Sequence, residues 1–135
     1  MTKTKLSVSK SDRCGLIAAG NYDLTIKSAK IYREVVKGKE TFVTVEFVAV
    51  DDMGYEIYEK FRIADICELG LNLRDYRYDP LQNLMETILD EPVDDINEDN
   101  VLKLRGKSFN ADVYHQELED GRVYPHINVD SISKI

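Results

Sequence analysis

Aromatic and basic side chains interleave along the first half of the chain, between residues 30 and 62. The aromatic members are Tyr32, Phe42 and Tyr58, and the basic members are Lys30, Lys60 and Arg62. Exposed aromatic rings stack on nucleic-acid bases, for about 1–3 kcal/mol per base, while lysine and arginine side chains follow the phosphates. If neighbouring strands bring these side chains to one sheet face, their types predict a surface for single-stranded nucleic acid.

The residue types that carry catalysis or bind metal ions are not spaced as in an enzyme. His115 and His126 lie 11 residues apart, and neither Cys14 nor Cys67 adds the ligand spacing typical of zinc. The sequence has no glycine-rich phosphate loop of the usual patterns and no nucleophile elbow. The adjacent acids at residues 51–52 fall in an expected turn, where acids are common for conformational reasons. We therefore expect no enzyme, no cofactor and no metal site.

The spacing of the apolar residues predicts strands at both ends of the chain and one helix between them. The strands are expected over residues 22–31, 40–50, 55–63, 108–117 and 123–132. The helix is expected over residues 80–90, where apolar residues recur every three or four positions, with Asp79 as its N-terminal cap. Along the first strand the alternation changes phase, which predicts a bulge near Lys27 or Ser28.

Glycine-bearing turns at Gly38, Gly54 and Gly121 predict how these strands pair. If each turn is a three-residue loop with its glycine in the left-handed conformation, apolar residues oppose apolar residues throughout. The expected core pairs are Ala29–Val45, Ile31–Val43, Val43–Ile63, Val45–Phe61, Ala111–Val129 and Val113–Ile127. The expected outer pairs are Glu46–Lys60, Val48–Tyr58, Tyr114–His126 and Gln116–Tyr124.

The same pairing brings the interleaved aromatic residues to one face of the first three strands. Tyr32 is expected beside Phe42, and Tyr58 is expected at the other end of this face. The alternative is that these aromatics are ordinary strand residues, or that the segment over residues 64–79 covers them. Only exposed rings are free to stack on bases.

The basic residues of that face differ in their expected neighbours. Lys60 lies opposite Glu46, whereas Lys30 and Arg62 have no expected acidic neighbour and are the better candidates for phosphate contacts. Residues 74–78 also interleave aromatic and basic side chains in an expected loop. That loop either clamps a nucleic-acid strand or satisfies its charges internally.

A length of 135 residues and an apolar content of 43% fit one domain with an ordinary core. The net charge is −7, but six of the 25 acidic residues and no basic residue fall within residues 90–99. The rest of the chain carries 18 basic and 19 acidic residues, so its charge neither predicts nor excludes an anionic partner. We expect a polar N-terminal arm over residues 1–19 and one domain over residues 20–135. That domain includes a solvated acidic loop at 90–99, for which partner binding is the alternative role.

The apolar runs are far shorter than the roughly 20 residues that a membrane span needs, so no membrane partner is expected. Residues 1–10 are polar and basic and show no secretory signal. Cys14 and Cys67 are too few for a disulfide framework, so we expect reduced thiols and a cytoplasmic location.

Besides the order of the elements, four short segments of the sequence are informative. They are Gly20-Asn21-Tyr22, the alternating run over 43–50 that ends at Asp52-Met53-Gly54, Leu104-Arg105-Gly106-Lys107, and the hairpin at Asp120-Gly121. Together, over residues 20–132, they resemble the OB-fold single-stranded DNA-binding proteins of phages and mobile elements. The resemblance implies a mainly β fold, a five-stranded OB-fold-like barrel with one helix between strands three and four.

The resemblance also implies a function. The chain would bind single-stranded DNA with little sequence preference, in phage or mobile-element replication or recombination, in the host bacterial cytoplasm. Its partners would be single-stranded DNA, replication or recombination proteins and a second copy of the chain. Three phosphate contacts would make log affinity fall with log salt concentration at a slope of about −2. A non-enzymatic protein-interaction or assembly module on the same barrel is the alternative, and an oligosaccharide ligand ranks third.

Overall fold

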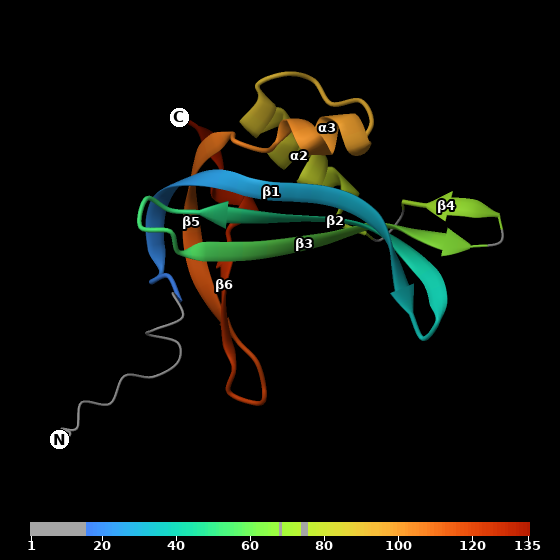
Figure 1. Ribbon diagram of the computed structural model, residues 1–135, viewed down its shortest axis with the longest axis horizontal. Helices are drawn as coiled ribbons and strands as arrows, with labels where there is room; N and C mark the ends of the chain where they lie inside the picture. Colours follow the sequence, from blue (N-terminus) through green and yellow to red (C-terminus); the bar gives the residue numbers. More distant parts are fainter. Residues whose placement is uncertain (1–15, 68, 74–75) are drawn as a thin grey trace.

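The computed structural model describes residues 16–67, 69–73 and 76–135, and it is a mainly β chain with one curled antiparallel sheet (Figure 1). The strands are β1 (Gly20–Val36), β2 (Lys39–Val50), β3 (Glu56–Cys67), β4 (Gly70–Asn72), β5 (Ser108–Glu117), β6 (Val123–Ile127) and β7 (Ser133–Lys134). The helices are α2 (Tyr78–Leu89) and α3 (Glu98–Lys103), with a 3-10 turn η1 (Val129–Ser131). The prediction of a mainly β, barrel-like fold is confirmed.

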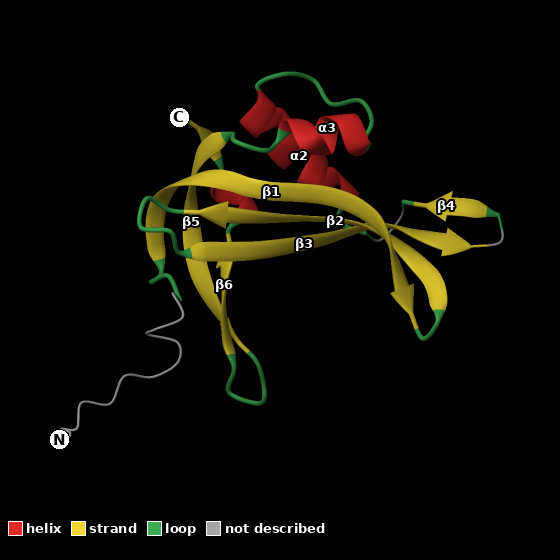
Figure 2. Cartoon of the chain, in the orientation of Figure 1, coloured by secondary structure: helices red, strands yellow, loops and turns green. Residues whose placement is uncertain are grey.

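The sheet has the order β4-β3-β2-β1-β5-β6, and β7 adds to β5. β1 belongs to both halves of the sheet, because Gly20–Thr25 pairs with β5 and Thr25–Val36 pairs with β2. Figure 2 shows the β5–β6 hairpin crossing the β1–β2–β3 layer steeply, with α2 and α3 together on one side. The sheet therefore forms a half-barrel, and the two helices pack against β3 and β1.

A bulge between Ile26 and Ser28 bends β1 where it passes from β5 to β2. Leu24 and Ile26 are buried before the bulge, and Ala29 is buried after it, so the inward-facing positions change from even to odd. The predicted bulge is confirmed. Its extra residue lets one strand serve two differently oriented halves of the sheet.

The segment at residues 105–107 holds the bend of β1. The N–H of Ile26 donates to the carbonyl of Lys107 at 2.9 Å, and the N–H of Gly106 donates to the carbonyl of Ile26 at 2.8 Å. The guanidinium of Arg105 donates to the carbonyl of Ala29 from Nε at 3.3 Å and from Nη2 at 3.1 Å. Backbone groups of Ile26 and Ala29, on either side of the bulge, thereby gain partners from this segment.

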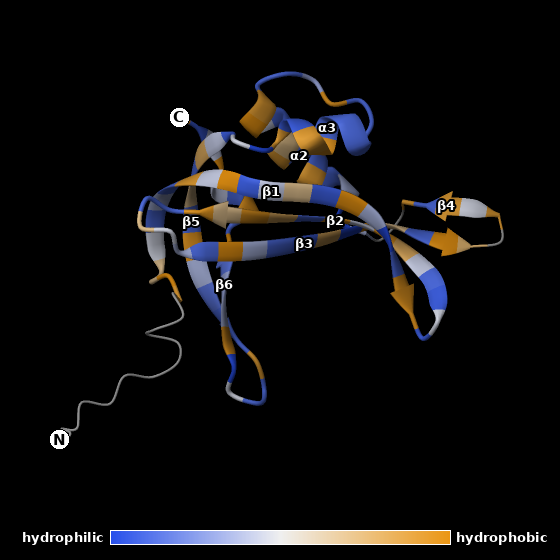
Figure 3. Cartoon of the chain, in the orientation of Figure 1, coloured by the Kyte–Doolittle hydropathy of each residue, from blue (hydrophilic) through white to orange (hydrophobic). Residues whose placement is uncertain are grey.

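The core lies between the curled sheet and the helices, and Phe47, Phe61 and Phe109 are among its largest side chains. Hydrophobic and hydrophilic positions follow one another along the strands (Figure 3). Ile17, in the expected N-terminal arm, is buried too, and its carbonyl accepts a hydrogen bond from Nε2 of His115 at 2.7 Å. Residues 1–15 of that arm lie outside the described residues. None of the described helices is long and apolar enough to cross a membrane.

The helix α2 has the apolar face that its sequence predicts. Its buried residues are Leu81, Leu84, Met85 and Ile88. The helix begins at Tyr78, and Arg77 is the N-cap, so the prediction of Asp79 as the cap was wrong. Asp79 lies in the first turn instead, where a negative charge is favourable beside the helix N-terminus.

Some elements were not predicted from the apolar spacing. Among the described residues, β4, β7 and α3 add to the five expected strands and the one expected helix. β6 ends at Ile127, because the side chain of Asn128 accepts the N–H of Asp130 and begins η1. The expected Ala111–Val129 pair is therefore absent from the paired residues of β5 and β6.

The acidic segment over residues 90–99 is anchored by an apolar residue. Its six acids are exposed, whereas Val93 is 1% exposed and belongs to the core. The side-chain amide of Gln82 donates to the carbonyl of Val93 at 2.7 Å, and the N–H of Val93 donates to the carboxylate of Glu86 at 2.9 Å. The segment is thus a charged surface tied to α2, and from Glu98 onward it is the helix α3.

The register of β1 against β2 differs from the predicted one by two residues. Ile31 lies opposite Val45 instead of Val43. Two features together cause the shift. The turn consists of Lys37 and Gly38 alone, with φ values of 52° and 77°, and a bulge between Glu34 and Val35 adds the second residue. A shift of two residues leaves every side chain on its predicted face but gives it new cross-strand neighbours.

The other registers agree more closely with the sequence. The confirmed pairs are Val45–Phe61, Glu46–Lys60, Val48–Tyr58, Val113–Ile127, Tyr114–His126 and Gln116–Tyr124. Val43 lies opposite Ala64 instead of Ile63, because a bulge separates Val43 from Thr44.

Replacing Arg105 with alanine should lower the free energy of unfolding by about 1 kcal/mol, because the carbonyl of Ala29 loses two donors. Chemical denaturation followed by circular dichroism measures the change. Lys103→Ala is the matched control, since Lys103 makes an exposed ion pair with Glu91 at 3.4 Å, which contributes little. Equal losses in the two variants would show that Arg105 does not hold the bend.

Candidate functional site

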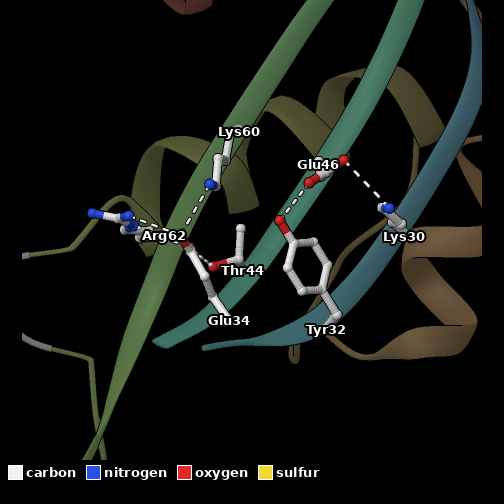
Figure 4. Close-up of polar contacts among 7 residues, drawn as sticks. All are labelled: Lys30, Tyr32, Glu34, Thr44, Glu46, Lys60 and Arg62. Atoms are coloured by element: carbon white, nitrogen blue, oxygen red, sulfur yellow. Dashed lines mark hydrogen bonds and ion pairs between the residues drawn. The ribbon is translucent and has the colours of Figure 1, made fainter. Parts of the chain in front are cut away.

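All six residues that the sequence analysis selected lie on the outer face of β1, β2 and β3, the face turned away from the core; Figure 4 shows its central part. The rows across the three strands are Lys30–Glu46–Lys60 and Tyr32–Thr44–Arg62, flanked by the pairs Val48–Tyr58 and Glu34–Phe42. The shifted register thus brings the carboxylates of Glu34 and Glu46 among the basic side chains. These two acids decide the electrostatics of the face.

Glu34 is the centre of one charged cluster. Its Oε1 accepts hydrogen bonds from the Thr44 hydroxyl at 2.9 Å and from Nε of Arg62 at 3.1 Å. Its Oε2 accepts from Nζ of Lys60 at 3.0 Å and from Nη2 of Arg62 at 2.8 Å. The Arg62 contact, helped by Lys60 and Thr44, outweighs burial and lowers the pKa of Glu34 to about 2. The expectation that Arg62 has no acidic neighbour was wrong.

Glu46 is the centre of a second cluster. The phenol hydroxyls of Tyr32 and Tyr58 both donate to its carboxylate, and Nζ of Lys30 lies 3.5 Å from it. Burial raises the pKa of both phenols, as does the hydrogen bond to Glu46, and the pKa of Tyr58 reaches about 12. Burial opposes the charge of Glu46, but the three donors outweigh it and lower its pKa. The expectation that Lys30 has no acidic neighbour was therefore wrong as well, and Lys60 pairs with Glu34.

Phe42 lies apart from the two tyrosines. Its ring meets the ring of Tyr76 edge-on at 5.7 Å, and the guanidinium of Arg62 lies 4.4 Å from its centroid. The segment before α2 thus partly covers Phe42. For this residue, the alternative prediction of cover by the segment over residues 64–79 applies. Of the interleaved residues 74–78, positions 74 and 75 lie outside the described residues. Arg77 is turned to the barrel, where it lies over the buried ring of Phe61 at 4.1 Å.

A groove opens beside Tyr58, between the start of β3 and the β5–β6 hairpin. Its volume is about 580 Å³, and its walls are Val48, Glu56, Tyr58, Gln116, Leu118, Tyr124, Pro125 and His126. The side chains of Tyr58 and Tyr124 are 50% and 41% exposed, and the ring of His126 lies 5.8 Å from that of Tyr114. The groove therefore offers flat, accessible rings on two of its sides.

The residues of the β5–β6 hairpin were not among the predicted site residues. The turn at Gly121 predicts the Gln116–Tyr124 and Tyr114–His126 pairs, but nothing in the spacing places them near Tyr58. That proximity depends on the curl of the sheet. The one feature of the sequence that points to this proximity is a charged residue, Glu59, among the inward-facing apolar positions of β3.

Glu59 joins β3 to β6 across the seam of the half-barrel. No backbone ladder links these two strands among the described residues. The carboxylate of Glu59, 3% exposed, accepts the N–H of Ile127 at 2.6 Å, and Nδ1 of His126 lies 3.3 Å from both of its oxygens. Burial raises the pKa of Glu59, although Ile127 and His126 oppose that shift. One side chain thus positions His126 at the wall of the groove.

No known family model matches the chain, and no curated protein is significantly similar to it in sequence. The described residues contain no group of three or more His, Cys, Asp or Glu side chains that could hold a metal ion. Cys67 is an exposed free thiol, and its sulfur lies 3.0 Å from the carbonyl of Gly70.

Replacing Glu34 with glutamine should lower the free energy of unfolding at neutral pH by about 3 kcal/mol, since each unit of pKa shift is worth about 1.4 kcal/mol. The folded-state pKa of about 2 lies below the ordinary 4.5, so this stability is present above pH 4.5 and is lost as pH falls towards 2. Denaturant titrations at several pH values measure the difference between wild type and variant.

Glu40→Gln is the control for that series, because Glu40 lies on the same hairpin in an exposed ion pair with Arg33 at 3.3 Å. Its effect should be small at every pH. A Glu34→Gln effect that stays constant down to about pH 2.5 would contradict the ion pairing of Glu34.

Proposed function

We propose that the chain is a single-stranded DNA-binding protein of the OB-fold type, with little sequence preference. The observation that carries the proposal is the groove, where Tyr58 of β3 faces Tyr124 and His126 of β6 across an open space of about 580 Å³. Flat rings of this kind stack on any base, because every base has a π face. The element order, three long strands, helices and a closing hairpin, is in keeping with an OB-fold.

The outer face of β1–β3 continues the groove towards Tyr32 and Lys30. Tyr58 and Tyr32 donate to the same carboxylate, that of Glu46, so the two rings are held in position from β3 and β1, the strands on either side of β2. Fixed rings lose little conformational entropy when a base stacks on them. A path for a DNA strand runs from the β5–β6 hairpin across β3 towards β1.

The charges on this path differ from the expected ones. Lys30, Lys60 and Arg62 each have a carboxylate partner, so phosphates must compete with Glu34 and Glu46 for these cations. We propose that stacking supplies most of the affinity. The slope of log affinity against log salt should then be shallower than the −2 expected for three free phosphate contacts.

Replacing Tyr124 or Tyr58 with alanine should weaken binding of a labelled 30-nucleotide poly-dT by about tenfold each, because one stacked base is lost. Fluorescence anisotropy at low salt measures the affinity. Tyr58→Phe should bind nearly as wild type, since it keeps the ring and loses only the hydroxyl that donates to Glu46.

Leu102→Ala is the matched control for the tyrosine variants. The exposed fraction of Leu102 is 40%, almost the same as that of Tyr124. Leu102 lies on α3, however, and is not among the residues that line the groove. It should leave the affinity unchanged. Wild-type protein that binds no poly-dT at tens of micromolar, or alanine variants that bind as tightly as wild type, would refute DNA binding at the groove.

The edge strand β4 favours a second candidate, an assembly module whose partner is another copy of the chain. β4 ends the sheet order, and Leu69, Leu71 and Leu73 are 99%, 62% and 49% exposed along its hairpin. The described residues of this edge, 69–73, carry no charge. Two equal edges pair antiparallel about a two-fold axis.

Under this second candidate, wild-type protein should dimerise at high concentration, and Leu71→Asp should remain a monomer because it places like charges at the shared edge. Light scattering after size-exclusion chromatography measures the mass. Leu102→Asp is the control, with the same added charge on α3. A monomeric wild type at millimolar concentration would dismiss the assembly module.

A further inference from the structure

Four hydrogen-bond donors converge on the carboxylate of Glu34 (Figure 4). The hydroxyl of Thr44 comes from β2, and the ammonium of Lys60 and the forked guanidinium of Arg62 come from β3, all within 3.1 Å of a carboxylate oxygen. Thr44 is 0% exposed, so its hydroxyl is directed to this anion and not to solvent. Glu34, from β1, is the acceptor that all these donors share.

The same types of donor suit a phosphate. A guanidinium binds carboxylate and phosphate with the same fork of parallel N–H groups, and an ammonium and a hydroxyl complete the shell of a tetrahedral oxyanion. Arg62 and Lys60 carry two positive charges against the single negative charge of Glu34. The donor set therefore keeps a net positive charge, which attracts a phosphodiester.

We propose that Glu34 occupies a phosphate-binding site in the free protein, and that a backbone phosphate of single-stranded DNA takes its place on Thr44, Lys60 and Arg62. The proposal rests on the function proposed above and names the contact that its basic residues make. It also gives Glu34 a role, since the internal anion keeps Arg62 and Lys60 side by side until the DNA arrives.

The position of Glu34 in β1 allows this exchange. The pairing of β1 with β2 shifts between Glu34 and Val35, where Thr41 of β2 is the extra residue, and beyond this bulge the β1–β2 hairpin extends past the edge of the helical layer (Figure 1). Val35 is 59% exposed, and the exposed Lys37 and Lys39 lie at the hairpin tip. Glu34 can therefore turn away without uncovering the core, while the basic tip meets the same DNA strand.

The first test uses inorganic phosphate as the probe and thermal unfolding as the readout. Glu34→Gln leaves the donors without their anion, so phosphate should raise its melting temperature above that in chloride at matched ionic strength. Wild type and Glu40→Gln should show no such difference, because the site is filled in both. A Glu34→Gln variant that responds to phosphate no more than Glu40→Gln would overturn the proposal.

The second test measures binding of 30-nucleotide poly-dT as a function of salt. Glu34→Gln should bind about tenfold more tightly than wild type at low salt and with a steeper salt slope, because freed cations gain phosphate contacts. Glu40→Gln removes the same charge from the same hairpin and should change the affinity less. An affinity of Glu34→Gln equal to or below that of Glu40→Gln would overturn the proposal.

A measurement on wild-type protein covers the case in which Glu34→Gln does not fold. Carbon-13 NMR follows the titration of the Glu34 carboxylate with and without poly-dT. Displacement by a phosphate should move its pKa from about 2 towards the ordinary 4.5, and an unchanged pKa in the complex would overturn the exchange. Wild type that binds no DNA while Glu34→Gln gains phosphate binding would refute the proposed function and leave the phosphate site standing.

Discussion

The bend of β1 is the feature on which both halves of the sheet depend. Before the bulge at Ile26 the even-numbered residues point into the core, and after it they point outward. Lys30 and Tyr32 reach the outer face only because this phase changes. The same bend turns the β5–β6 hairpin across the end of β3, so the segment at 105–107 that clamps it indirectly shapes the groove.

The outer face is a network of satisfied charges and not a basic strip. Glu34 and Glu46 each gather donors from two other strands, which ties β1, β2 and β3 together. Charge-assisted hydrogen bonds of this kind are stronger than those between neutral groups. Any anionic ligand must therefore exchange partners with the protein, while the rings of Tyr58 and Tyr124 remain accessible.

The sequence predicted the five longer strands, the bulge in β1 and the inward and outward faces of the first three strands, because all of these follow from periodicity. It did not predict the neighbours of Lys30 and Arg62. A register shift of two residues preserves the alternation of faces, so period-2 reasoning cannot detect it. The shift arises from the two-residue turn at Lys37 together with the bulge between Glu34 and Val35. The groove was missed for a different reason, since it joins β3 to β6, strands that are far apart in sequence and share no ladder among the described residues.

Glu59 shows how the groove between β3 and β6 is built. It occupies an inward position of β3 between Ile57 and Phe61, where a carboxylate costs desolvation that an apolar side chain would avoid. That cost is offset by the N–H of Ile127 and by His126, which otherwise would face β3 without a partner there. A backbone ladder would fix β6 rigidly along its length, whereas one carboxylate fixes it at a point. The place of the β5–β6 wall beside Tyr58 therefore depends on the contacts of Glu59 with Ile127 and His126.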